Sequence, residues 1–169
     1  MAILRASCHG LLALGERTAW IDGAHTVGPC WQEGPLLIRP TGRINALRWG
    51  EGLLRCGGFA LVVLAGVEPQ GTETVRLARA VHEGGGAFVA LTTSAVMAAL
   101  RVTSRVLPHS YEWLPGPFAD PAGARAATIE VRVRAPGWNE SARVVLPVSP
   151  YDLRLSLDPG LVDRRGVDR

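Results

Sequence analysis

The residues with acid, base or nucleophile character are few and scattered. Asp22 and His25 directly follow the segment RTAWI, which has the composition of a short buried strand. Ligands of open α/β sheets bind beyond the carboxyl ends of the strands, so this pair stands where an acid/base couple would act. The sequence shows no serine or cysteine nucleophile in a recognisable turn to accompany this pair, and no third residue that would orient the base. We therefore favour a turn-capping aspartate beside a surface histidine.

The cysteines offer a second kind of chemistry. Cys8 is followed by His9, and a thiol is activated when a base lies within hydrogen-bond reach. Adjacent residues of a helix point about 100° apart and do not face each other, so a structural thiol is the favoured interpretation. Cys30 and Cys56 complete an odd, widely spaced set without a CxxC pair. The sequence predicts no disulfide framework, no zinc site and no other cofactor.

All 18 basic residues are arginines, because the chain contains no lysine. Schiff-base chemistry and phosphate binding by the lysine of a nucleotide loop are therefore excluded within this sequence. Residues two apart on a strand share a face, so late arginines form a candidate DNA-binding stripe. Interspersed glutamates and an aromatic content of 6% favour a solvated sheet face instead. The candidate DNA-binding residues are Arg101, Arg105, Arg132 and Arg134.

Length and composition indicate a packed protein. With 169 residues, 47% hydrophobic and 20% charged, the chain suits one packed domain and is too apolar to be disordered. It has no run of the roughly 18 apolar residues that span a bilayer and no cleavage-site signal, so we expect a cytoplasmic protein without membrane contact. We expect one domain over residues 1–157 and a flexible charged tail over residues 158–169.

The first half of the chain alternates between helix and strand patterns. Helices are indicated by apolar residues at helical spacing that stop at glycines, and strands by short apolar runs. The expected helices are 2–14, 42–56 and 72–83, and the expected strands are 17–21, 36–38, 59–65 and 87–91. This alternation predicts an α/β fold with an open parallel sheet and crossover helices.

The second half has a different pattern. Segments 101–106, 128–134 and 142–148 alternate apolar and polar residues, as antiparallel strands with one wet face do. Between the first two, residues 108–123 are rich in proline and glycine, which predicts a loop. We expect these strands to extend the parallel sheet.

Three stretches resemble the RecA recombinase core downstream of its nucleotide-binding loop. They are ERTAWIDGAHTV (16–27), LLIRP (36–40) with GGFALVVLAG (57–66), and EGGGAFVALTT (83–93) followed by VTSRVLP and ATIEVRVRAPG. The closing YDLRLSLDPGLVDRRG (151–166) most resembles ImuA, the RecA-like member of bacterial mutasomes. The resemblance implies a RecA-like three-layer core with a mostly parallel central sheet extended by the C-terminal antiparallel strands.

The departures from RecA concern the nucleotide chemistry. The loop GxxxxGK[ST], whose amides and lysine hold phosphates, does not occur. A Walker B strand ends in an acid that holds the magnesium shell, and here FALVVLAG ends in Ala65 and Gly66. The position of the glutamate that orients water in RecA is Ala24. We therefore expect no ATP hydrolysis and no enzymatic activity.

The ImuA resemblance implies a function through binding. It implies a non-catalytic adaptor in DNA-damage-induced mutagenesis, the translesion synthesis of the SOS response, close to the nucleoid. The implied partner is an ImuB-like homologue of Y-family polymerases, with RecA and single-stranded DNA as further candidates. By analogy with RecA filament contacts, a partner segment would dock on a flank of the sheet and its helices. The residues expected there are Leu36, Ile38, Arg48 and Arg55.

Three alternatives stay open. The first is a fragment of a nucleotide-binding RecA-superfamily ATPase, which predicts an in-frame GxxxxGK[ST] upstream of Met1. The second is a SulA-like inhibitor of cell division, which would bind a tubulin-like GTPase. The third is an enzyme built on Asp22, His25 or a cysteine, which activity screens with substitutions at these residues would test.

Overall fold

The computed structural model describes residues 2–25, 27, 34–92, 98–116 and 121–147. The chain divides into two compact units, Met1–Ala99 and Leu100–Arg169. This division differs from the single domain expected over residues 1–157, and the expected tail over 158–169 lies outside the described residues. None of the helices in the described ranges is long and apolar enough to cross a membrane.

The first unit alternates helices and parallel strands, as predicted. Its helices are α1 (Ala2–Ala13), α2 (Arg43–Arg55) and α3 (Thr72–Gly84), and its strands are β1 (Thr18–Asp22), β2 (Leu36–Ile38), β3 (Leu61–Ala65) and β4 (Ala87–Ala90). The strands form sheet A in the order β2-β1-β3-β4, and every neighbouring pair is parallel. The predicted parallel sheet with crossover helices is confirmed, with boundaries that shift by a residue or two.

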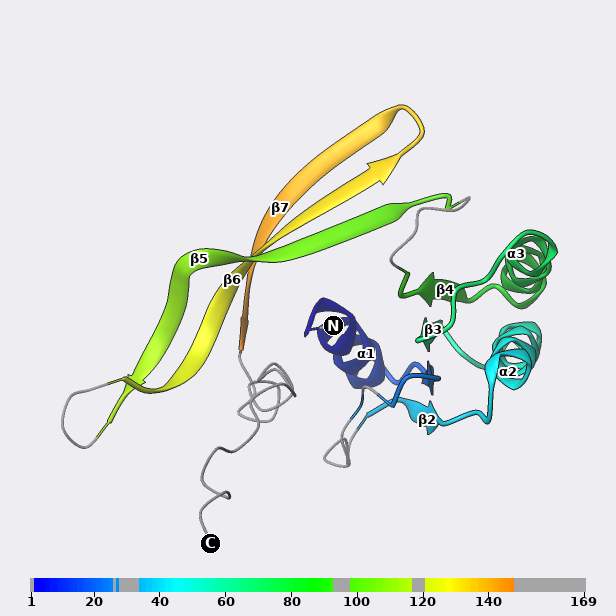
Figure 1. Cartoon of the computed structure of the whole chain (residues 1–169), viewed down its shortest axis with the longest axis horizontal. Coiled ribbons are helices and arrows are strands. Elements are labelled where there is room, and N and C mark those ends of the chain that lie inside the picture. Colours follow the sequence, from blue (N-terminus) through cyan, green and yellow to red (C-terminus); the bar gives the residue numbers. More distant parts are fainter. Residues whose placement is uncertain (1, 26, 28–33, 93–97, 117–120, 148–169) are drawn as a thin grey trace, which may run out of the picture. The chain divides into compact units, whose positions relative to one another are not determined.

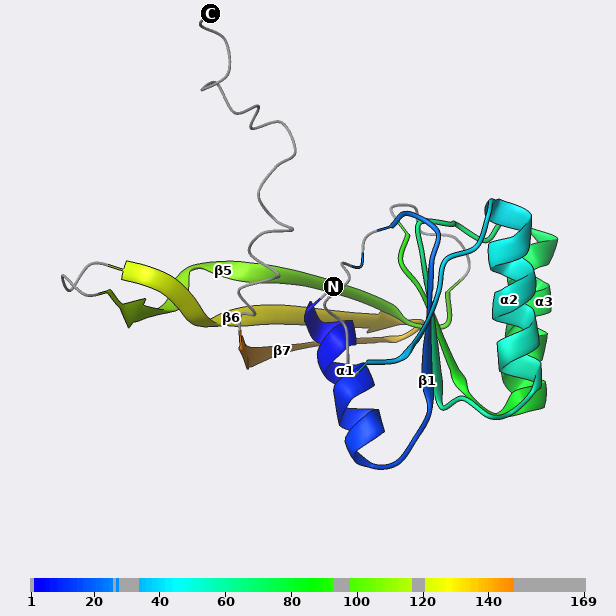
Figure 2. The same ribbon diagram turned by 90° about the horizontal axis from the view of Figure 1, so that it is seen from below.

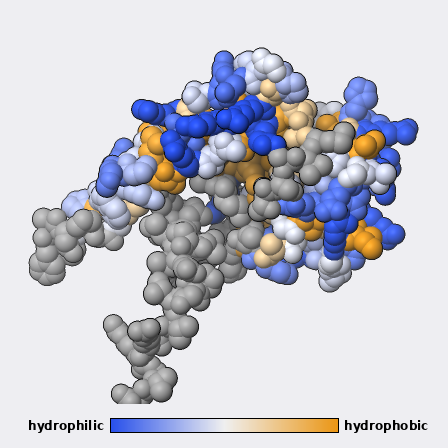
Figure 3. Space-filling model, turned by 45° about the horizontal axis from the view of Figure 1, so that its top comes forward, coloured by the Kyte–Doolittle hydropathy of each residue, from blue (hydrophilic) through white to orange (hydrophobic). Residues whose placement is uncertain are grey.

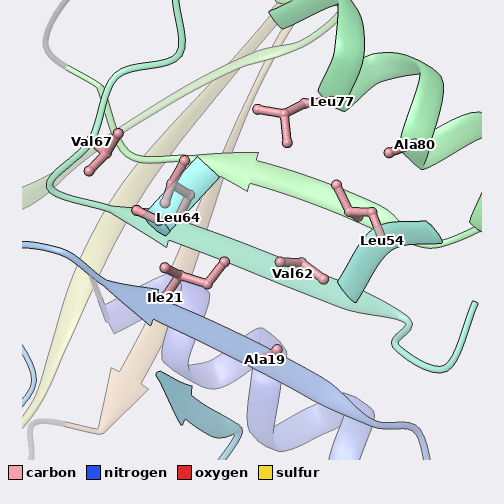
Figure 4. Close-up of a cluster of buried hydrophobic side chains, with 9 residues drawn as sticks. Ala19, Ile21, Leu54, Val62, Leu64, Val67, Leu77 and Ala80 are labelled. Carbon is pink, nitrogen blue, oxygen red and sulfur yellow. The ribbon is translucent and has the colours of Figure 1, made fainter. Parts of the chain in front are cut away.

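Helices cover both faces of sheet A (Figures 1 and 2). On one face, α2 and α3 contribute Leu54, Leu77 and Ala80 to a core that also contains Ala19, Ile21, Val62 and Leu64 from β1 and β3 (Figure 4). On the other face, Cys8 of α1 packs with Trp20 and Val63. All residues of β1 and β3 are therefore buried, which is why LVVLA reads as one uninterrupted apolar run.

The second unit is an antiparallel sheet. Strands β5 (Arg101–Pro115), β6 (Pro121–Ala135) and β7 (Trp138–Pro147) form sheet B in the order β5-β6-β7. Pro136 and Gly137 make the turn between β6 and β7, and the φ of 77° at Gly137 is one that glycine adopts without a steric penalty. The expectation that these strands extend the parallel sheet is wrong, because sheets A and B share no strand.

The proline-rich segment between the first two strands of this unit is also different from the prediction. The expected loop over residues 108–123 is wrong for most of its length, because β5 continues through Pro108 to Pro115. Pro108 is tolerated because β5 is an edge strand. The ladder is irregular between Val106 and Tyr111, where the Ser110 hydroxyl lies 3.1 Å from the carbonyl oxygen of Thr128 and accepts the Thr128 N–H at 3.1 Å. A side chain thus restores the pairing that the irregularity removes.

The two faces of sheet B have opposite character. On one face Ile129, Val131 and Val133 of β6 stand opposite Val106, Ser104 and Val102 of β5. On the other face Glu130, Arg132 and Arg134 stand opposite Arg105, Thr103 and Arg101. Hydrophilic side chains gather over the strands of this unit in the space-filling view (Figure 3). The period-2 alternation predicted from the sequence is confirmed by this register.

Candidate functional site

The carboxyl edge of sheet A is where an open α/β sheet places its ligands. Asp22 and Ala65 end the neighbouring strands β1 and β3 and are register partners. The Asp22 side chain is fully buried, and its Oδ2 accepts a hydrogen bond from the Val27 N–H at 2.9 Å. The Gly23 N–H donates to the Ala65 carbonyl at 2.9 Å, which continues the ladder past the strand end. The aspartate therefore holds the turn after β1, as the turn-capping interpretation predicts.

Ala24 lies close to Gly66, the residue that follows β3 at this edge. A Cβ added at Gly66 would lie 2.4 Å from the Ala24 Cβ and 2.5 Å from its backbone nitrogen. Gly66 also has a φ of 76°, which L side chains rarely adopt. His25 beside it is exposed, with a positive φ of 53°. The two positions where the RecA resemblance expects acids are thus packed against each other, and neither offers a carboxylate.

The Cys8 thiol lies in the core and not in a site. Its side chain has no exposed area, whereas the neighbouring His9 is exposed. Burial raises the pKa of the Cys8 thiol, although its interaction with Thr18 partly opposes this shift. A buried thiol with a raised pKa stays protonated near neutral pH, which makes it a poor nucleophile. The structure places Cys8 as a packing residue, in agreement with the favoured interpretation.

The residues expected to bind a partner do not all lie together. Leu36 and Ile38 belong to β2, an edge strand of sheet A, and their register partners Ala19 and Ile21 are part of the α2/α3-side core. Leu36 is 50% exposed, whereas Ile38 packs against that core. The structure therefore brings Leu36 and Ile38 to one open edge, on the side of the sheet that α2 covers.

The two arginines of α2 have different surroundings. Arg48 is exposed. Arg55 makes ion pairs with Glu51 at 2.8 Å and with Glu83 of α3 at 3.0 Å, and Arg43 and Arg76 also join the two helices through Glu73 and Glu51. Arg55 therefore lies on the α3 side of α2, away from β2, and its ordinary role is to hold the helix pair together.

Trp49 is a residue of this region that the sequence analysis did not single out. It is 52% exposed, and it lies two residues from Glu51, about 200° around the helix from the side that contacts α3. It is four residues from Leu53, which packs against the core, so both lie on one side of α2. That side is turned toward β2, because α3 lies over the β4 half of the sheet (Figure 1). We name Leu36, Ile38, Trp49 and Leu53 the edge flank.

The arginines expected to bind DNA come together on one face of sheet B. Arg101 stands directly opposite Arg134, and Arg105 stands opposite Glu130. On the other side of β6, Arg143 of β7 is also opposite Glu130. Arg132 and Arg134 are two residues apart on β6 and share this face. We name the exposed residues Arg101, Arg105, Arg132, Arg134 and Arg143 the arginine face.

Glu130 is an acid within the arginine face. It accepts from Arg105 Nε at 2.7 Å and lies 3.1 Å from Arg132. Desolvation raises the pKa of Glu130, but the hydrogen bonds and positive charges of Arg105 and Arg132 outweigh it, so the pKa is held below its ordinary value. Glu140 is opposite Val133 and thus at a register position of the apolar face. The interspersed glutamates that argued against an arginine stripe are therefore divided between the two faces.

No protein-family model matches the chain, and no curated protein matches it. Among solved structures, SulA from Pseudomonas aeruginosa is similar, with 22% identity, over 52% of this chain and 87% of SulA, at a TM-score of 0.40. A TM-score of 0.40 is too low to assign a fold family. The comparisons do not support the RecA and ImuA resemblance, which stays a prediction.

Proposed function

We propose that this protein is a non-catalytic adaptor that binds an extended segment of a partner protein along the edge flank. The observation that carries the proposal is the outer edge of β2, which pairs with no other strand among the described residues and lies beside two half-exposed apolar side chains, Leu36 and Trp49. An edge strand presents unpaired backbone N–H and C=O groups to which another strand can add. Main-chain hydrogen bonds would supply affinity, and the apolar side chains would supply anchors.

The chemistry of the edge flank defines the partner segment. Leu36 and Trp49 favour a segment with apolar residues on alternate positions, since alternate side chains of an added strand point to the same face. Arg48 is exposed, but it lies seven residues before Arg55 and therefore on the same side of α2, so it does not face the edge flank directly. By the ImuA resemblance, the segment belongs to an ImuB-like polymerase homologue, and RecA is the second candidate. Arg55, already engaged with Glu51 and Glu83, is a weaker candidate than Arg48.

The proposal includes the expectation that the protein catalyses no reaction. Its support is the contact between Ala24 and Gly66 at the carboxyl edge of sheet A, where acids would be needed for a magnesium-bound nucleotide. The fully buried Asp22 is occupied with the turn through Val27. A protein of this kind would keep the sheet as a scaffold and use its edge for assembly.

The test is a binding titration of the full chain with a purified ImuB-like polymerase homologue. We expect Trp49→Ala and Leu36→Ala each to weaken binding about tenfold, because truncated central anchors commonly cost more than 1 kcal/mol. The matched control is Val75→Ala, since Val75 is 60% exposed on α3. Circular dichroism would verify that all variants fold. Equal affinity of the wild type and both flank variants would remove the site assignment.

Two further measurements, ATP binding by the purified chain and cell growth on its expression, distinguish the rival functions. Magnesium-dependent ATP binding by the purified chain would favour the nucleotide-binding alternative and contradict the proposal. Filamentous growth on expression, without any need for the polymerase homologue, would favour the cell-division inhibitor. We expect neither result.

A further inference from the structure

We infer that the arginine face of sheet B binds the phosphate backbone of a nucleic acid without reading its bases. The proposal concerns the second unit of the chain and the edge flank concerns the first, so each can fail without the other. The candidate ligand is identified by charge, spacing and the kinds of side chain on the face.

The spacing of the guanidinium groups is set by the sheet. The Cα atoms of Arg132 and Arg134 are separated by about 6.6–6.8 Å along β6, and those of in-register neighbours such as Arg101 and Arg134 by the inter-strand distance of about 5 Å. Positive groups therefore recur at short intervals over three adjacent strands. A nucleic acid strand is a regular polyanion with one charge per about 3.4 Å of helix axis, so several phosphates can meet guanidinium groups at once.

The arginine face has more positive charges than acidic side chains to pair with them. Glu130 pairs with Arg105 and Arg132. Within the described part of the chain, Arg101, Arg134 and Arg143 have no ion pair. Glu140 lines a hollow with Arg132 and Arg134 but makes no ion pair with either. Arg101 and Arg134 are like charges held directly opposite each other without an ion-pair partner, which is costly in isolation, and an anionic ligand would remove that cost.

Two hollows on this face provide neutral donors beside the arginines. One is lined by Thr103, Ser104, Arg105, Glu130 and Arg132, and the other by Arg132, Arg134, Asn139, Glu140 and Ser141. Of the neutral residues, Thr103, Asn139 and Ser141 are at register positions of the arginine face, whereas Ser104 is at a register position of the apolar face. Hydroxyl and amide groups beside arginines are the usual partners of phosphate oxygens. Arg132 lines both hollows, so they adjoin along β6. Two neighbouring phosphate positions are consistent with a continuous backbone across the face.

The same register positions disfavour a protein as the ligand. Protein interfaces are held by buried apolar or aromatic anchors, and Val145 is the large apolar side chain near these arginines, opposite Thr128. Trp138 is opposite Ala135, on the apolar face. Among the described residues, no aromatic side chain stands at a register position between these arginines, so bases have no stacking partner there. The contacts are therefore to phosphates, and binding is independent of sequence.

The test measures fluorescence anisotropy of a labelled 20-nucleotide single strand and of the matching duplex with the full chain. We expect the variant Arg101→Gln/Arg134→Gln/Arg143→Gln to bind at least tenfold more weakly. The slope of log K against log salt should fall by about 0.7 per lost contact for the single strand or about 0.9 for the duplex. The form that binds more tightly identifies the physiological strand state, and salt-dependent binding of either supports the proposal.

Two controls separate a defined face from diffuse charge. The variant Arg17→Gln/Arg76→Gln/Arg79→Gln removes the same charge from exposed arginines of the first unit and should keep most of the affinity. Glu130→Gln removes the acid from the face and should strengthen binding several-fold. Equal weakening by both triple variants would overturn the proposal. So would absence of salt-dependent binding, or binding of polyglutamate at the arginine face as tight as that of DNA.

Discussion

Ala24 and Gly66 pack so closely that a methyl group at Gly66 would lie 2.4 Å from the Ala24 Cβ. The contact joins the turn after β1 to the end of β3, the two neighbouring strands whose carboxyl ends form the ligand edge of sheet A. Since Gly66 also has a φ of 76°, both the space and the backbone at this point require glycine. The close approach of Ala24 to Gly66 is therefore built into the fold, and it has measurable consequences.

Substitution at Gly66 should destabilise the protein. We expect Gly66→Ala to lower the free energy of unfolding by about 2–5 kcal/mol, since a left-handed non-glycine residue costs about 1–2 kcal/mol and overpacking about 1–3 kcal/mol. The matched control is Gly15→Ala, where φ is 81° but no atom lies within 4 Å of an added Cβ. Urea unfolding would compare them. A loss no larger at Gly66 than at Gly15 would contradict the packing argument.

The buried carboxylate of Asp22 should contribute to stability through the turn it holds. Asp22→Ala removes the acceptor of the Val27 N–H, and we expect a loss of about 1–3 kcal/mol because a buried donor is left without its partner. Asp22→Asn keeps a side-chain oxygen and should lose less. Thermal and urea unfolding would rank the three proteins. Equal stability of the wild type and Asp22→Ala would show that the hydrogen bond contributes nothing.

Glu130 should titrate at a lower pH than an isolated glutamate. Its folded-state pKa is held below the unfolded value by Arg105 and Arg132, against the opposing effect of desolvation. The associated stability is therefore present above the unfolded pKa and is lost as the pH falls through the folded pKa. NMR titration of the side-chain carboxyl carbon would measure the midpoint. We expect Arg105→Gln to raise it, and an unchanged midpoint would contradict the ion pair.

Two cysteines should differ sharply in reactivity toward a thiol reagent. Cys8 is fully buried, and burial raises its pKa, whereas Cys56 is exposed. In the native protein we expect labelling of Cys56 within minutes and labelling of Cys8 only after unfolding, because the thiolate is the reacting species. Peptide mass spectrometry would assign the labels. Rapid native labelling of Cys8 would show that α1 opens from the sheet readily.

Sequence patterns located the elements of the first unit because their signals are local. The run LVVLA is apolar at every position, which indicates a strand buried on both faces, and α3 ends where Gly85 adopts a left-handed φ of 72°. These features depend on residues close in the chain. The same holds for the side of β6 on which Arg132 and Arg134 lie, since a strand has a period of two.

Other features depend on contacts between distant segments. The separation of sheets A and B, and the continuation of β5 through Pro108 with help from Ser110, follow from pairings that alternation does not specify. The placement of Trp49 toward an open strand edge depends on which side of α2 meets α3.

The sequence alone shows that residues needed for nucleotide chemistry are missing. The tertiary structure decided which of the remaining residues contact each other. The missing lysines and the residues Ala24 and Ala65 are read directly along the chain. That Ala24 closes against Gly66, and that Arg101 meets Arg134 across two strands, was decided by packing and register. The physical reason is that periodicity fixes the face a residue takes on its own strand, whereas its neighbour on another strand is fixed by non-local hydrogen bonds and turns.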